Sequence, residues 1–247
     1  MSGFFVAKMP VRPEFAGVSS VFVLVFALPS YMALYKWLGN KEGVRVLIIL
    51  GLFAVVLESI AIDTGFPYGH FSYGEKIGAK VWGLVPWTVP FAWTPLLLFS
   101  MSLAARWTTH ALSTIALSAL LLVIIDMVLD PAAVAQGFWT YAQPGNFYQV
   151  PFSNFCGWFL SGAISSWVFQ TLARRARHFN KIEAAILPPV ALMSSSFLIL
   201  SFWTSVCFWM ELWLPTAVGT ALLGTISCYL FSSQPTPLPS LSTENIL

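Results

Sequence analysis

Seven apolar segments, each about as long as a membrane is thick, restrict what this chain can fold into. A helix needs about twenty predominantly apolar residues to cross a bilayer. The segments cover 17–38, 44–62, 82–105, 110–129, 152–172, 182–203 and 206–231. Because a spanning segment must satisfy its own backbone polar groups, they predict an all-α, polytopic transmembrane helical bundle. About seven spans are expected, with six as the alternative, since almost no linker separates the last two.

The composition agrees with this class of protein. Apolar residues make up 57% of the chain and charged residues only 9%, whereas a soluble domain carries roughly a quarter charged residues. A net charge of +2 gives no reason to expect a nucleic-acid partner. The three cysteines lie in apolar stretches, without the spacing of a zinc site or a disulfide framework. We therefore expect an integral, multi-pass protein whose surroundings are the lipid bilayer.

The segments indicate one transmembrane catalytic domain at 17–231. The N-terminal segment 1–16 lacks the apolar core of a signal peptide, so we expect the mature chain to begin near Met1. The Pro/Ser-rich tail at 232–247 is expected to be disordered. The links after the first, third and fifth segments hold eight of the 12 cations. The positive-inside rule then places those links in the cytoplasm, the N-terminus outside and the C-terminus inside.

This topology gathers acidic residues at one membrane face. Glu58 and Asp63 end the second segment, Asp126 and Asp130 end the fourth, and Glu211 lies near the start of the seventh. Asp126 and Asp130 are four residues apart and so share a helix face. Ionisable groups inside a span usually face a cavity or the bundle interior, where an apolar environment and a neighbouring carboxylate favour a protonated acid. A neutral acid beside an ionised one forms an acid/base pair; the alternative is that these acids only bind backbone groups at broken helix ends.

The two linkers on the same face are rich in aromatic residues. An interfacial belt explains part of them, but the opposite links carry few. An aromatic wall can bind an extended apolar ligand and stabilise a carbocation through its ring faces. His70 is either a proton relay or an ordinary interfacial histidine, and the three dispersed histidines predict no metal site. The candidate substrate-binding residues are Tyr68, His70, Tyr73, Trp82, Trp87, Trp93, Trp139, Tyr148, Asn154 and Trp158.

Two motifs resemble a known membrane family. The first is Glu58 followed by DTGFPYGHFSY at 63–73, GLVP at 83–86 and Trp93. The second is Asp126, DP at 130–131, GFW at 137–139 and VPFSNFCGW at 150–158. Together they resemble the signatures of the CruF-type carotenoid 1,2-hydratase family, over about 45–172 and more weakly beyond. The chain departs from the family pattern at Tyr141, where Trp is common, and at Gln149, where Gly is common.

The resemblance implies a hydro-lyase of carotenoid biosynthesis that needs no cofactor. The family adds water to the terminal C1=C2 double bond of an acyclic end group, as in γ-carotene or lycopene, and gives a tertiary 1-hydroxy carotenoid. A relative in archaea acts on a C50 carotenoid. The implied location is a bacterial plasma membrane or an internal photosynthetic membrane, and the implied partners are a downstream carotenoid glycosyltransferase or desaturase.

The chemistry of the acids agrees with that reaction. Protonation of the alkene gives a tertiary carbocation, which water captures. Asp126 or Glu58 is expected to donate the proton, Asp63 or Asp130 to orient the water, and Asn154 to hold it.

Two alternatives remain from the sequence. A carotenoid cyclase would use the same acids and carbocation, but its product keeps the mass of the substrate whereas a hydrated product gains one water. A proton- or cation-coupled transporter would use the acids as a path, although the chain lacks the repeated broken helices of many transporters.

Overall fold

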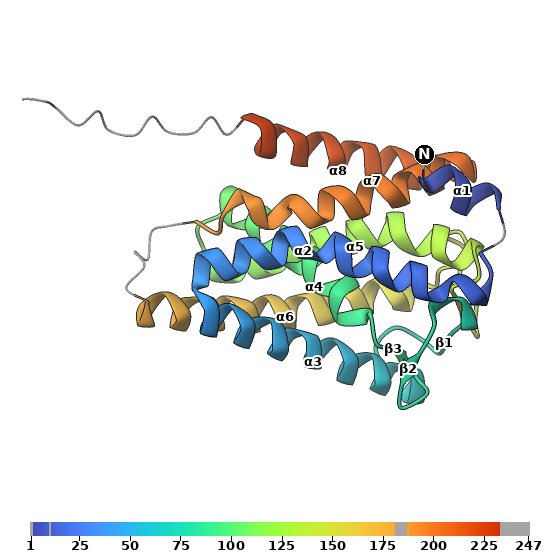
Figure 1. The fold of residues 1–247 in the computed structure, drawn as a ribbon, viewed down its shortest axis with the longest axis horizontal. Helices are drawn as coiled ribbons and strands as arrows, with labels where there is room; N and C mark the ends of the chain where they lie inside the picture. The colour runs from blue at the N-terminus through green and yellow to red at the C-terminus, as the bar shows by residue number, and fades with distance from the viewer. Residues whose placement is uncertain (1, 10, 181–186, 233–247) are drawn as a thin grey trace, which may run out of the picture.

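The computed structural model describes residues 2–9, 11–180 and 187–232. In these ranges a short helix, α1 (Ser2–Lys8), precedes seven long helices, one for each predicted segment. The long helices run side by side (Figure 1) and are α2 (Ala16–Leu38), α3 (Asn40–Thr64), α4 (Val89–Trp107), α5 (Ala111–Ala135), α6 (Phe152–Phe179), α7 (Ser194–Trp209) and α8 (Trp213–Ser232). This arrangement confirms the prediction of an all-α, polytopic bundle.

Five of the described helical segments are long and apolar enough to cross a membrane. They are Pro13–Leu38, Asn40–Thr64, Ala111–Ala135, Val190–Trp209 and Trp213–Ser232. The helices α4 and α6 run alongside them in the same bundle (Figure 1).

Three predicted boundaries are wrong. The third helix begins at Val89 rather than at residue 82, because 82–86 belong to a small hairpin. The sixth begins at Ser194, after Pro188, Pro189 and a 3-10 turn. It then continues past residue 206 to Trp209, since no Gly or Pro interrupts the apolar pattern before Pro215. The predicted disordered tail lies, apart from Ser232, outside the described residues.

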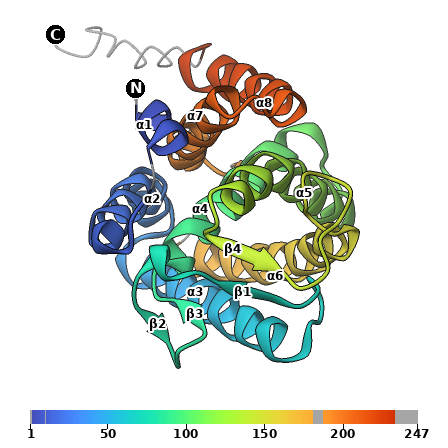
Figure 2. The same ribbon diagram turned by 90° about the vertical axis from the view of Figure 1, so that its right-hand side faces the viewer.

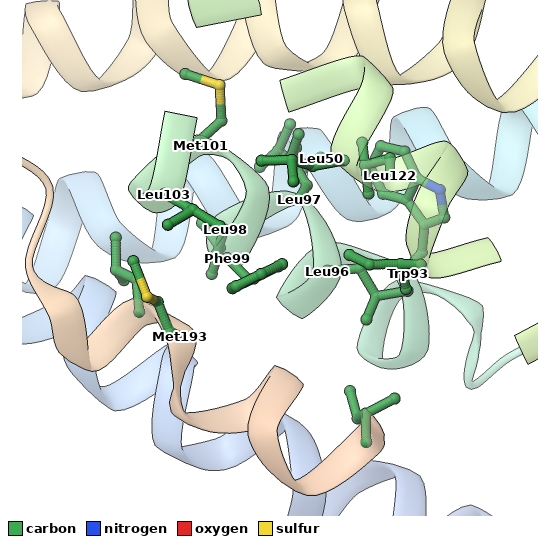
Figure 3. Close-up of a cluster of buried hydrophobic side chains, with 14 of the residues drawn as sticks. Leu50, Trp93, Leu96, Leu97, Leu98, Phe99, Met101, Leu103, Leu122 and Met193 are labelled. Carbon is green, nitrogen blue, oxygen red and sulfur yellow. The ribbon is translucent and has the colours of Figure 1, made fainter. Parts of the chain in front are cut away.

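The helix α4 is the centre of the bundle. Its residues Leu96, Leu97, Leu98 and Phe99 are consecutive and all buried, so the helix is covered on every side. Figure 3 shows Leu97 beside Leu50 of α3, and it shows Leu96, Leu98 and Phe99 within the same buried apolar cluster. By packing against both α3 and α5, α4 fixes the relative positions of the two helices that carry the predicted acids.

The C-terminal ends of α3 and α5 lie at one end of the bundle, which we call the site end. The loop after α3 contains β1 (Phe71–Tyr73), β2 (Lys80–Val81) and β3 (Val85–Pro86), and the loop after α5 contains β4 (Trp139–Tyr141). The strands β2 and β3 pair within one loop, whereas β1 pairs with β4 antiparallel and joins the two loops. Figure 2 looks onto this end and shows β1 beside β4, with α1 above α2. The sequence did not predict this pairing.

Candidate active site

The β1–β4 ribbon covers the site end with an aromatic face. Its register pairs Phe71 with Tyr141 and Tyr73 with Trp139. Because successive side chains of a strand point to opposite faces, these four residues lie on one face, and all four line a cavity below the ribbon. The intervening Ser72 is exposed. The ribbon therefore turns aromatic rings from both loops toward the bundle interior.

Each strand of the ribbon supplies one tyrosine to one acid. The Tyr73 hydroxyl donates to Glu58 Oε2 at 2.5 Å, and the Tyr141 hydroxyl donates to Asp130 Oδ2 at 2.6 Å. Burial, reinforced by the adjacent carboxyl groups, raises the pKa of both tyrosines well above the ordinary value. The two phenols are therefore constant hydrogen-bond donors. They fix the orientation of two acids that come from different helices, α3 and α5.

Asn154 connects the two acids of α5. It lies in the first turn of α6 and is buried, and its Nδ2 donates to Asp126 Oδ2 and to Asp130 Oδ2, each at 2.7 Å. A side-chain amide carries two N–H donors, so one is available for each acid. Asp130 thus receives two donors on Oδ2, while the buried Oδ1 of Asp126 has no partner among the described residues. The environments of the two acids therefore differ.

The cavity has a volume of about 780 Å³. Glu58, Asp130 and Asn154 form its polar end, and Asp126 lies behind Asn154 rather than on the surface. The rest of the surface is mainly aromatic and aliphatic. Cavities of about 300–1,000 Å³ that are mostly apolar, with a few convergent polar groups, are typical of small-molecule sites. The lining of this cavity includes Phe22, Phe26, Tyr68, Phe71, Tyr73, Trp93, Leu96, Phe138, Trp139, Tyr141, Trp158, Phe202 and Trp203.

Most of the predicted site residues meet at this cavity. Eight line it directly, and Asp126 is joined to it through Asn154. The eight are Glu58, Tyr68, Tyr73, Trp93, Asp130, Trp139, Asn154 and Trp158.

Five predicted residues are placed elsewhere. Asp63 is exposed on the last turn of α3, and its spacing from Glu58 turns it to another face. Trp82 is 72% exposed at the tip of the β2–β3 hairpin. His70 is exposed, with its ring against Gly65. Trp87 and Tyr148 pack edge-to-face on Phe91 and Phe147, at 6.1 Å and 5.1 Å between ring centroids. Glu211 is also exposed, in the turn between α7 and α8.

Several cavity residues were not predicted to bind substrate. The hydroxyl of Tyr141 was missed, because nothing in the sequence pairs residue 141 with residue 71. Lys76 also lines the cavity, and its Nζ donates to the carbonyl of Gln136 at the C-terminus of α5, at 2.7 Å, where a cation is favoured. Phe22 and Phe26 of α2 were missed too, although their spacing of four residues places them on one helix face. In the described ranges, no three His, Cys, Asp or Glu side chains are arranged to hold a metal ion.

The loop that contains Tyr68 packs closely against α6 at Gly157. A Cβ at Gly157 would clash with the ring of Tyr68 and lie 2.9 Å from the carbonyl group of Pro67. Ser153 Oγ adds a 3.1 Å hydrogen bond to the carbonyl oxygen of Tyr68. Tyr68 is buried as a result, so the small size of Gly157 determines where this ring meets the cavity.

These features define a class: a multi-pass helical membrane protein whose apolar, aromatic cavity ends in a group of carboxylic acids. A family model described as carotenoid biosynthesis protein matches residues 18–226, and the chain therefore belongs to this family. The match confirms the resemblance to the CruF-type hydratases that the two motifs indicated.

A curated relative from Haloarcula japonica is named bisanhydrobacterioruberin hydratase. It is 36% identical over 154 residues, which are 59% of this chain and 50% of the relative. The chain thus spans about half the length of the curated relative that it matches. No solved structure matches the chain.

Proposed function

We propose that this protein is a cofactor-independent carotenoid hydratase. It would add water across the terminal C1=C2 double bond of an acyclic end group of the γ-carotene or lycopene type and release a tertiary 1-hydroxy carotenoid. The observation that carries the proposal is the acid group itself: Asp130, tied to Asp126 through Asn154, lies with Glu58 at the end of an apolar cavity. Membership of a carotenoid biosynthesis family and the name of the Haloarcula japonica relative support it.

The reaction needs both a proton donor and a group that removes a proton from water. Three carboxyl groups in one apolar region cannot all carry charge at low cost. Asp130 accepts hydrogen bonds from Tyr141 and Asn154, and two donors favour the ionised form of a carboxyl group. We assign the negative charge to Asp130 and protons to Asp126 and Glu58.

Glu58 is the proton donor in this scheme, because it lines the cavity whereas Asp126 does not. The alkene π electrons take the proton from Glu58 at the less substituted carbon, C2, and leave a tertiary carbocation at C1. The carboxylate that remains on Glu58 is stabilised by the Tyr73 hydroxyl. Ring faces at the same end, including those of Trp139 and Trp158, stabilise the cation.

Asp130 completes the reaction. It accepts a proton from the water that attacks C1, so the product gains the elements of one water and the site as a whole keeps its charge. Transfer of the proton from Asp130 to Glu58 restores the starting state. General acid–base assistance of this kind typically contributes about 10²–10⁴-fold to the rate, and the remainder would come from positioning and electrostatic stabilisation.

The product chemistry suggests the next step. A tertiary alcohol is the group that a carotenoid glycosyltransferase would use, and a desaturase would act on the adjoining chain. We propose such enzymes as consumers of the product.

Expression in cells that make lycopene or γ-carotene tests the proposal. Wild-type protein should convert the pigment to a species heavier by one water, and Asp130→Asn should reduce that species by at least about 10²-fold. Glu42→Gln, which removes a carboxylate paired with Arg45 at the opposite end of α3, is the matched control and should retain the product. A new pigment of unchanged mass would identify a cyclase instead, and an unchanged pigment profile would contradict both.

A further inference from the structure

The cavity does not stop at the acid group but continues to the outer face of α2. Val18 and Phe22 line it and are 54% and 51% exposed. With Phe26 they recur every four residues, so they form one stripe on α2. Residues 16–26 of α2 cover roughly 16 Å of helix, about half of the ~30 Å hydrocarbon core. The stripe therefore connects the site with the surroundings of the bundle.

Aromatic rings follow the same course from α2 to α7. Phe22 packs edge-to-face on Phe26, with ring centroids 6.0 Å apart, and Phe26 packs on Phe202 of α7 at 6.2 Å. The row continues through Trp203, at 5.3 Å, to Phe138, at 6.0 Å. Phe138 directly precedes Trp139 in the β1–β4 ribbon. All of these rings line the cavity. Trp139 packs edge-to-face on Tyr73 at 5.8 Å, and Tyr73 donates to Glu58, so aromatic rings mark the course from the face of α2 to the acids.

Other parts of the cavity wall are partly covered by neighbouring elements. Toward the bundle centre, Leu96 and its successors on α4 are buried. At the site end the β1–β4 ribbon lies across the cavity. The helix α1 packs on α7, where Gly3 lies so close to Ser205 that a Cβ would clash, and Phe5 and Val6 of α1 also line the cavity. The helices α2 and α7 stand side by side next to α1 (Figure 2). The exposed large apolar residues of the lining are Phe5, Met9 and Phe15, which precede α2, and Val18 and Phe22, which are the ones that belong to a long helix.

We infer that the polyene chain of the substrate leaves the site sideways between α2 and α7, along the row from Trp203 to Phe22, and continues into the lipid. This inference rests on the proposed function. A cavity of about 780 Å³ is of the size that encloses a drug-sized ligand, so it encloses the reacting end of a forty-carbon polyene and not the whole molecule. The far end of the carotenoid then remains in the bilayer during the reaction.

Two substitutions on α2 test the direction. Val18→Trp places a bulky ring where the chain would leave, and Val21→Trp is the matched control, because Val21 is 58% exposed but does not line the cavity. Because a closely lined apolar passage tolerates added bulk poorly, Val18→Trp should lower hydration of lycopene about tenfold or more. It should leave hydration of a ten-carbon analogue with the same terminal alkene within about twofold, since this analogue fits inside the cavity. Val21→Trp should change neither.

Equal turnover of lycopene by the two variants would overturn the inference, as would equal losses with the long and the short substrate. A second measurement needs no turnover: a photo-reactive amino acid is placed at residue 18 or at residue 21, and the purified protein is illuminated with lycopene. Cross-linking from residue 18 well above that from residue 21 supports the inference, and equal yields contradict it. Wild-type protein that hydrates neither substrate would contradict the proposed function alone, because the cross-linking still decides the direction of the chain.

Discussion

The hydroxyl of Tyr141 donates a 2.6 Å hydrogen bond to Asp130, so a strand in one loop orients a carboxyl group at the end of α5. Tyr141→Phe keeps the ring and removes this donor. A hydrogen bond to a charged group contributes about 1.5–3 kcal/mol, so kcat for hydration should fall about 10–100-fold while KM changes little. Kinetics in detergent or in vesicles check this expectation. Tyr148→Phe, in the same loop but away from the cavity, is the control, and equal activity of the two variants would show that the Tyr141 hydroxyl has no part in the reaction.

Glu58 and Asp63 lie on the same helix and allow a direct comparison of two acids. Glu58 lines the cavity and Asp63 is exposed, so Glu58→Gln should abolish the hydrated pigment whereas Asp63→Asn should leave it unchanged. The measurement is the ratio of hydrated to unhydrated carotenoid in cells with matched amounts of each protein. Loss of product in Asp63→Asn would show that hydration requires Asp63. It would contradict the assignment of the reaction to the acids that line the cavity.

Asn154 serves both the fold and the site. Asn154→Leu leaves Asp126 and Asp130 without their shared amide donor, and an unpaired buried polar group costs about 1–3 kcal/mol. We expect a lower unfolding temperature in detergent together with loss of hydration. The control is Asn180→Ala, which removes an amide donor to the carbonyl oxygen of Leu38 at the far end of α6. It should lower the unfolding temperature but retain turnover per folded molecule, and a similar loss of turnover would assign Asn154 a purely structural role.

Gly157 determines the position of Tyr68 because it has no side chain, and the Tyr68 ring occupies the space that a Cβ would fill. Gly157→Ala should push the loop at 65–70 away from α6, with a destabilisation of about 1–3 kcal/mol and a rise in KM for the carotenoid. Gly224→Ala on α8, where an added Cβ meets nothing within 4 Å, should leave both quantities unchanged. Thermal unfolding and initial rates measure the two effects. An unchanged KM in Gly157→Ala would show that Tyr68 does not contact the substrate.

The sequence predicted the helices and the acid pair well, because both depend on local patterns. Apolar length predicted the bundle, and the spacing of Asp126 and Asp130 predicted that they share a face. Alternation of the spans placed Glu58 at the same end. Each of these steps uses only helix geometry and the direction of the chain.

The pairing of β1 with β4 could not be predicted from local sequence patterns. The strands β1 and β4 are three residues each, too short for a period-two pattern to stand out among the glycines and prolines of their loops. Their register is a tertiary property, and it places Tyr73 and Tyr141 on the same face of the ribbon, toward the cavity. The sequence also does not show in which direction a loop side chain points. Trp82, Trp87 and Tyr148 were therefore predicted to bind substrate, although an aromatic residue at the site end can equally face away from the cavity.

The hydrogen bonds of the acids are local along the chain, and this has a consequence for how the protein is assembled. Glu58 and its tyrosine are 15 residues apart, both before α4, while Asp126, Asp130, Tyr141 and Asn154 lie within 28 residues of one another, all after the start of α5. The chain therefore carries two separate half-sites, and a break at the link between α4 and α5 would cut neither. Two fragments, one ending and one beginning in that link, should recover hydration when they are produced together in one membrane, through pairing of β1 with β4 and packing of α4 against α5.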